Sequence, residues 1–166
     1  MPDNHNYSAT TNSKIMPLDQ LASLAATWHN EKQKIVLCHG VFDLLHPGHI
    51  KHLEAAKCEG DRLMVTLTPD RYVDKGPGRP IFDEGMRAYS LASIECVDAV
   101  AINSWNTAVK TISIIKPDVY VKGSDYANAE DDVSGKIQDE VDAVNSVGGR
   151  FHVTDEVTFS SSGIIN

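Results

Sequence analysis

The amino-acid sequence predicts an α/β fold: a Rossmann-like parallel sheet of about five strands with helices on both faces. Two observations support this prediction. Short apolar runs alternate with helix-like segments along most of the 166-residue chain. The runs are continuously apolar, which is typical of parallel strands that are buried on both faces. Such an alternation favours one sheet that is covered by helices on both sides.

The predicted elements follow one another from residue 16 onward. Strands are expected at residues 34–38, 61–70, 97–102, 118–123 and 150–154. Helices are expected at residues 16–33, 47–60, 83–95, 106–116 and 129–149. Pro47 stands in the first turn of the second helix and Gly60 just past its end, a common arrangement at helix termini. Residues 71–82 are rich in Gly, Pro and charge, so we expect a loop there.

The length of the chain suggests one domain. Residues 1–15 are polar, with many Asn, Ser and Thr residues, and predict a disordered tail. Residues 16–166 are expected to form the folded domain. The sequence ends inside what looks like the first turn of another helix, so two interpretations stay open: a domain from a longer protein, or an ordinary frayed C-terminus.

Composition and charge exclude several classes of protein. The net charge of −8 makes the chain a poor general binder of nucleic acids or anionic membranes. No apolar stretch approaches the ~18 residues that are needed to span a bilayer, and the N-terminus lacks the pattern of a secretory signal. The three cysteines (Cys38, Cys58 and Cys96) are an odd number without paired spacing, which favours reduced thiols and a cytoplasmic protein.

The stretch "HGVFDLLHPGH", residues 39–49, fills the first corner between a strand and a helix. Ligands of parallel sheets bind at such corners, and the first N–H groups of a helix attract anions. His46 and His49 are three residues apart, so both can face the corner from one side of the first turn. We interpret this pair as donors to phosphoryl oxygens. His39 follows an apolar strand and is interpreted as a satisfied buried histidine, and His52 as a solvated or packing residue. A metal site of four histidines is disfavoured, because these positions cannot easily converge on one ion.

The same stretch resembles the signature of the cytidylyltransferase-like nucleotidyltransferases, which is marked by His-x-Gly-His. The resemblance spans roughly residues 17–166 and includes "DEGMRAYSLASIECVDAV", "KPDVYVKGSDY" and "FSSSGIIN". The chain is similar above all to the adenylyltransferase domain that activates heptose 1-phosphate, and also to glycerol-3-phosphate cytidylyltransferase. It departs from the heptose enzymes at "CHGVFD" and "SSS", where they usually have Thr-Asn-Gly-Cys-Phe-Asp and Ser-Thr-Thr. The nucleotide base and the acceptor therefore stay open.

The resemblance implies nucleotidyl transfer, in which an acceptor phosphate attacks the α-phosphorus of a nucleoside triphosphate and pyrophosphate leaves. Because the acceptor is already ionised, the protein must align the reactants and neutralise charge. We expect His46, His49 and Lys122 to be the catalytic residues. Two substrate pairs are open: ATP with a sugar phosphate of the heptose type, or CTP with a polyol phosphate or phosphonate. The rival from another class is a nucleotide-binding module without turnover.

The other site residues are expected at strand ends and in the loops that follow them. For the nucleotide we expect contacts from Gly40, Val41, Phe42, Asp43, Gly48, Ser160, Ser161 and Ser162. For the acceptor and its phosphate we expect contacts from Lys75, Arg79, Arg87 and Asp125. Lys75 and Arg79 stand in a loop that suits a lid over phosphates, and the serines precede a helix start, where phosphate binds well. Asp43 is expected to orient a donor, and Arg87 is assigned by resemblance alone.

Mg²⁺ is the expected counter-ion of the triphosphate. It usually keeps several water ligands and uses few protein groups, so we assign no metal ligand. The acidic run at residues 130–132 is interpreted as a solvated helix start. A homodimer, and fusion to or cooperation with a ribokinase-type sugar kinase, are implied by the resemblance alone.

Overall fold

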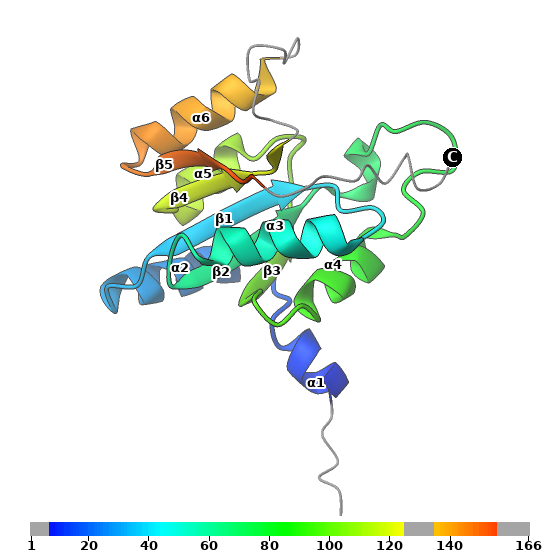
Figure 1. The fold of residues 1–166 in the computed structure, drawn as a ribbon, viewed down its shortest axis with the longest axis horizontal. Helices are drawn as coiled ribbons and strands as arrows, with labels where there is room; N and C mark the ends of the chain where they lie inside the picture. Colours follow the sequence, from blue (N-terminus) through cyan, green and yellow to red (C-terminus); the bar gives the residue numbers. More distant parts are fainter. Residues whose placement is uncertain (1–6, 125–134, 156–166) are drawn as a thin grey trace, which may run out of the picture.

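The computed structural model describes residues 7–124 and 135–155, and one five-stranded sheet forms its centre (Figure 1). The strands are β1 (Ile35–Gly40), β2 (Arg62–Leu67), β3 (Ala99–Ile102), β4 (Val119–Lys122) and β5 (Arg150–Val153). All neighbouring strands run parallel, in the order β3-β2-β1-β4-β5. The predicted Rossmann-like sheet is confirmed.

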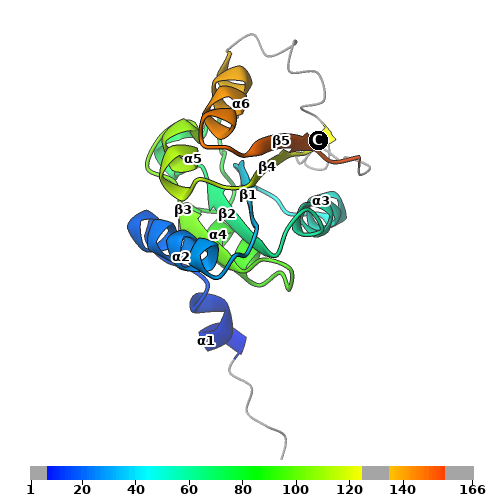
Figure 2. The same ribbon diagram turned by 90° about the vertical axis from the view of Figure 1, so that its left-hand side faces the viewer.

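The helices cover both faces of this sheet. They are α1 (Tyr7–Asn12), α2 (Leu18–Asn30), α3 (Pro47–Lys57), α4 (Glu84–Ala92), α5 (Val109–Ile115) and α6 (Lys136–Ser146), with a short 3-10 turn η1 (Asp70–Tyr72). Helices α2, α5 and α6 pack on one face, whereas α3 and α4 pack on the other (Figure 2). Of the helix expected at 129–149, the structure shows Lys136–Ser146, with Gly135 as its N-cap, and residues 129–134 lie outside the described ranges. Of the described helices, none has the length and apolarity to cross a membrane.

Strand β1 shows how the sequence builds two separate cores. Ile35 and Leu37 point to one face and join the cluster under α2, α5 and α6. Val36 and Cys38 point to the other face and join the cluster under α3 and α4. All four side chains are fully buried. A strand that is buried on both faces needs a continuous apolar run, which explains why this stretch shows no polar alternation.

The strand order places a crevice at a defined position in the fold. The chain runs outward from β1 through β2 to β3, and then crosses back so that β4 lies on the other side of β1. The order therefore reverses between β1 and β4. Ligands of open α/β sheets bind outside the carboxyl ends of the strands at such a point, so the ends of β1 and β4 locate the candidate site.

The expected disordered tail at residues 1–15 needs a correction for residues 7–15. Residues 7–12 form α1, and the hydroxyl groups of Ser8 and Tyr89 lie 3.3 Å apart. Lys14 and Met16 exchange backbone hydrogen bonds with Val100 at 2.8 and 3.0 Å. Residues 14–16 thus lie along the outer edge of β3, where unpaired backbone groups otherwise invite association. The polar composition suggested disorder because it does not reveal such backbone contacts with a distant strand.

Candidate functional site at the ends of β1 and β4

Two histidines cap the N-terminus of α3. The Nδ1 of His46 accepts a hydrogen bond from the N–H of Gly48 at 3.1 Å. In return, the Nδ1 of His49 accepts one from the backbone N–H of His46 at 3.3 Å. The ring centroids are 4.0 Å apart, so the two side chains meet on one side of the first turn, as their spacing predicts. Because each Nδ1 is an acceptor, each neutral ring carries its proton on Nε2.

His49 is held in the neutral form. Burial, together with the nearby His46, His52 and Lys75, lowers the pKa of His49 from 6.5 to about 4. The ring of Phe42 packs edge-on against it, with 6.0 Å between the ring centroids. At neutral pH this imidazole is therefore an uncharged donor through Nε2–H, and its orientation is fixed before any ligand binds.

The turn after β1 has an unusual backbone. Phe42 has a φ of 52°, a conformation that bulky residues rarely adopt and that often occurs at functional sites. Its side chain is 8% exposed and belongs to the core under α3 and α4. A Cβ atom at Gly40 would lie 3.2 Å from the Phe42 ring. The ring is therefore a core group, and any nucleotide contact of Phe42 would have to come from its backbone.

Asp43 fastens the loop at residues 71–82 to this turn. Its buried carboxylate accepts hydrogen bonds from the Nε of Arg79 and, at 2.7 Å, from the N–H of Ile81. Burial alone would raise the pKa of Asp43, but the hydrogen bonds from Arg79 and from the backbone outweigh it and lower the pKa below the usual value. The carboxylate thus holds a cation of the loop, and its expected role in orienting a donor to phosphate stays a prediction.

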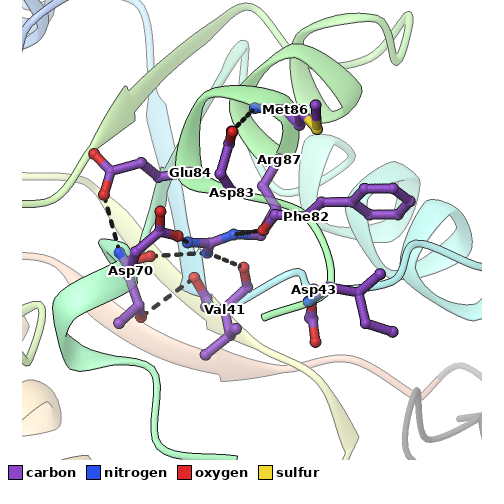
Figure 3. Close-up of polar contacts among 11 residues, drawn as sticks. Val41, Asp43, Asp70, Phe82, Asp83, Glu84, Met86 and Arg87 are labelled. Carbon is purple, nitrogen blue, oxygen red and sulfur yellow. Dashed lines mark hydrogen bonds and ion pairs between the residues drawn. The ribbon is translucent and has the colours of Figure 1, made fainter. Parts of the chain in front are cut away.

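Arg87 is a buried residue of α4. Its side chain is fully buried and donates to the carbonyl oxygens of Phe82, Val41 and Thr68 at 3.0, 2.8 and 2.8 Å (Figure 3). It also pairs with Asp70 at 2.6 Å. The resemblance implied a contact with the acceptor phosphate, and in this structure the buried side chain contacts these protein groups. It ties the turn after β1 to both ends of the loop at residues 71–82.

A cleft of about 320 Å³ opens beyond the ends of β1 and β4. Four of the predicted site residues line it: Gly40, Val41, Lys75 and Lys122. The other lining residues are His39, Thr68, Tyr72, Asp74, Asn106, Thr107, Lys136, Ile137 and Glu140. Lys75 is exposed on the loop, where Gly76 and Gly78 adopt positive φ angles. Partial desolvation by the surrounding protein and the charge of Arg79 lower the pKa of Lys75, although Asp43 opposes this shift.

Lys122 stands at the end of β4 and reaches across to β1. It is 6% exposed, and its Nζ donates to the carbonyl oxygen of His39 at 2.6 Å. The ring of His39 pairs with the hydroxyl of Thr66 at 2.9 Å. Burial and the charge of Lys122 lower the pKa of His39 to about 3. The prediction that His39 is a satisfied buried histidine is confirmed.

His52 is also structural. It is buried on α3, and its Nδ1 lies 2.8 Å from the hydroxyl of Thr154, which follows β5. Among the other predicted residues, His46 and His49 lie at the start of α3 and are not among the lining residues of the cleft. Asp125 and Ser160, Ser161 and Ser162 lie outside the described residues.

Glu140 is a cleft residue that the sequence analysis missed. No role was assigned to it from the sequence, yet the residue is only 5% exposed. Ile137 and Val144 are buried on the same face of α6, at positions i−3 and i+4. The position of this carboxylate within the apolar stripe of an amphipathic helix is the sequence feature that indicates its burial.

No protein-only metal centre is formed by residues 7–124 and 135–155, since no three His, Cys, Asp or Glu side chains there come close enough to hold an ion. The described residues therefore assign no ligand to Mg²⁺. A Mg²⁺ ion that arrives with a triphosphate would use mostly phosphate and water ligands.

A parallel sheet with a cation-bearing cleft at its switch point defines an α/β domain that binds ligands at the strand ends. The chain belongs to the cytidylyltransferase-like family, whose model matches residues 37–166. This confirms the resemblance to the nucleotidyltransferases that the motif at residues 39–49 indicated.

Two curated relatives are both named bifunctional protein HldE. The protein from Gluconobacter oxydans (strain 621H) is 41% identical over 150 residues, which are 89% of this chain and 30% of that protein. The protein from Methylobacillus flagellatus is 42% identical over 160 residues, which are 95% of this chain and 31% of that protein. The chain thus spans about a third of the length of these relatives.

Two solved structures share the fold. The lipopolysaccharide core biosynthesis protein from Thermoplasma volcanium GSS1 is 27% identical, with a TM-score of 0.61 over 76% of this chain and 99% of that chain. The pantoate-beta-alanine ligase from Francisella tularensis, with a TM-score of 0.55 and 15% identity, covers 91% of this chain and 75% of that chain. The second similarity concerns the fold alone.

Proposed function

We propose that this chain is a nucleotidyltransferase domain that transfers an adenylyl group from ATP to a sugar 1-phosphate of the heptose type and releases pyrophosphate. The observation that carries the proposal is the reciprocal cap of His46 and His49 at the start of α3, beside the end of β1. The motif resemblance to the heptose-1-phosphate adenylyltransferases and the similarity to the HldE proteins support this choice of substrates.

In the proposed reaction, an ionised oxygen of the acceptor phosphate attacks the α-phosphorus of ATP. A new P–O bond forms while the bond from the α-phosphorus to the bridging oxygen breaks, and that electron pair leaves with pyrophosphate. Negative charge therefore builds up on the phosphoryl oxygens. The Nε2–H groups of His46 and His49 supply donors for this charge, and the N-terminus of α3 adds its partial positive charge.

Two lysines of the cleft complete the proposed charge pattern. Lys122 is fixed at the end of β4, whereas Lys75 lies on a glycine-containing loop that can move over the substrates. Arg79 of the same loop rests on Asp43 in this structure. A triphosphate would compete with Asp43 for this guanidinium, so binding of the nucleotide and closure of the loop would be coupled.

The remaining parts of the proposal rest on resemblance and composition. Mg²⁺ would accompany the triphosphate and neutralise part of its charge. We propose cooperation with a sugar kinase, in keeping with the word bifunctional in the names of the relatives. A homodimer stays a prediction. The three cysteines (Cys38, Cys58 and Cys96) are thiols and not disulfides, which supports a reducing compartment such as the cytoplasm.

A second candidate is transfer from CTP to a polyol phosphate, which the description of the matching family model favours. A screen for pyrophosphate release separates the candidates: ATP, CTP, GTP and UTP are each combined with sugar phosphates, polyol phosphates and phosphonates in the presence of Mg²⁺. Release with ATP and a heptose 1-phosphate is the expected result. Release with CTP and a polyol phosphate would favour the second candidate, and absence of both release and nucleotide binding would contradict nucleotidyl transfer altogether.

A further inference from the structure

Glu140 is a buried acid on a helix whose other acids face solvent. Its side chain is 7% exposed, whereas Asp139 and Asp142 of α6 are exposed. Ionisable side chains are seldom buried to this degree unless they are paired. The partners of Glu140 therefore indicate why the carboxylate is there.

The carboxylate of Glu140 joins three elements. Its Oε1 accepts a hydrogen bond from the hydroxyl of Tyr120 on β4 at 2.9 Å. Its Oε2 accepts one from the N–H of Ala108, which directly precedes α5, at 3.0 Å. Each oxygen is thus held by a donor on a different rigid element, so the position and the plane of the carboxylate are fixed.

The fixed carboxylate faces Lys122. The Nζ of Lys122 lies 4.0 Å from Oε1 of Glu140 and donates to the carbonyl oxygen of His39 at 2.6 Å. The ammonium group therefore sits between a carbonyl on β1 and a carboxylate on α6, where the strand order reverses. Both side chains line the cleft, and both are 7% exposed.

We propose that Glu140 is a positioning residue for Lys122. It holds the ammonium at the crevice between β1 and β4, where the reaction proposed above places phosphate, and the inference rests on that proposed function. A carboxylate in direct contact with phosphate would repel it, so Glu140 acts through the lysine. A lysine side chain has many rotamers, and a fixed counter-charge pre-organises it for the transition state.

The substitution Glu140→Gln tests the charge while it preserves the shape. Glutamine can still accept from the N–H of Ala108 and donate to the hydroxyl of Tyr120. We expect kcat to fall roughly 10- to 100-fold, because misplaced cations lose transition-state stabilisation, while KM for ATP stays within about threefold. Asp139→Asn removes the same charge from an exposed site of α6 and should leave kcat unchanged. Thermal unfolding of both variants verifies that they fold.

A double-mutant cycle shows whether Glu140 acts through Lys122. In a Lys122→Met background, Glu140→Gln should change kcat by less than about twofold, since the group that it positions is absent. Equal losses in both backgrounds would overturn the inference, as would full turnover of Glu140→Gln. If the unaltered chain neither binds ATP nor releases pyrophosphate, the proposed function fails, and the inference that rests on it fails with it.

Discussion

His46 and His49 cap each other across the first turn of α3, and each does so through Nδ1. The two rings accept hydrogen bonds from the backbone N–H groups of Gly48 and His46, and each ring carries its own proton on Nε2. The same two histidines therefore cap the helix and provide the proposed phosphate donors. Both rings are oriented without any ligand, which is the pre-organisation that electrostatic stabilisation of a transition state requires.

The buried guanidinium of Arg87 should contribute strongly to stability. In Arg87→Lys, a single ammonium cannot serve three carbonyl oxygens and Asp70 together. We expect the free energy of unfolding to fall by about 3 kcal/mol, because buried acceptors lose a charged donor. Denaturant unfolding measures this loss. Arg71→Lys alters an exposed arginine of the same region and should cost less than about 0.5 kcal/mol. Equal stability of the two variants would contradict the role assigned to Arg87.

Asp43 should control the loop that carries Lys75 and Arg79. In Asp43→Asn the N–H of Ile81 keeps an acceptor, but the ion pair with Arg79 is lost. We expect faster hydrogen exchange at residues 72–79 and a loss of about 1–3 kcal/mol in the free energy of unfolding. Asp142→Asn on the exposed face of α6 is the matched control. Unchanged exchange in the loop would show that Asp43 does not fasten it.

Buried histidines should make the protein acid-sensitive. The pKa of His39 is about 3 and that of His49 about 4, whereas an unfolded histidine titrates near 6.5. Below pH 6.5 the unfolded chain binds protons that the folded chain does not, so stability is complete above pH 6.5 and falls as pH drops toward these values. For the fully buried His39 the slope is about 1.4 kcal/mol per pH unit.

The variant His39→Asn isolates this contribution. Asparagine can still bond to the hydroxyl of Thr66, but it does not titrate. The test measures the unfolding free energy from about pH 7 to about pH 4. It should decline less steeply in this variant than in the unaltered chain, because unfolding takes up about one proton fewer. His29→Asn, at a partly exposed histidine paired with Asp118, serves as control. Parallel curves for the unaltered chain and His39→Asn would contradict the inferred neutral state.

The sheet could be predicted because its signal is local. The apolar run at residues 35–38 must be buried on both faces, and the pairing of His46 with His49 follows from helix periodicity around Pro47 and Gly48. The contacts of residues 14–16 with the sheet could not be predicted, because their partner, Val100, lies far along the chain.

The site was predictable only in part, for the same reason. Lys122 could be placed because it directly follows an apolar strand. The burial of Arg87 and Glu140 could not be predicted, because their partners come from several elements. Arg87 contacts three carbonyl oxygens and Asp70, and Glu140 contacts Tyr120, Ala108 and Lys122. Only the face of α6 that Glu140 shares with apolar residues indicated its burial.

The proposed role of His49 as a phosphate donor through Nε2–H is tested most directly by comparing the turnover of His49→Asn and His49→Gln. Calorimetry measures the binding of ATP to both variants. Asparagine can replace the Nδ1 that caps α3 but lacks a donor near Nε2, whereas glutamine places an amide N–H near Nε2. We expect His49→Asn to lose roughly 100-fold or more in kcat, to retain ATP binding within about threefold, and to be less active than His49→Gln. Full turnover by His49→Asn, or a loss that merely follows weaker ATP binding, would contradict this role.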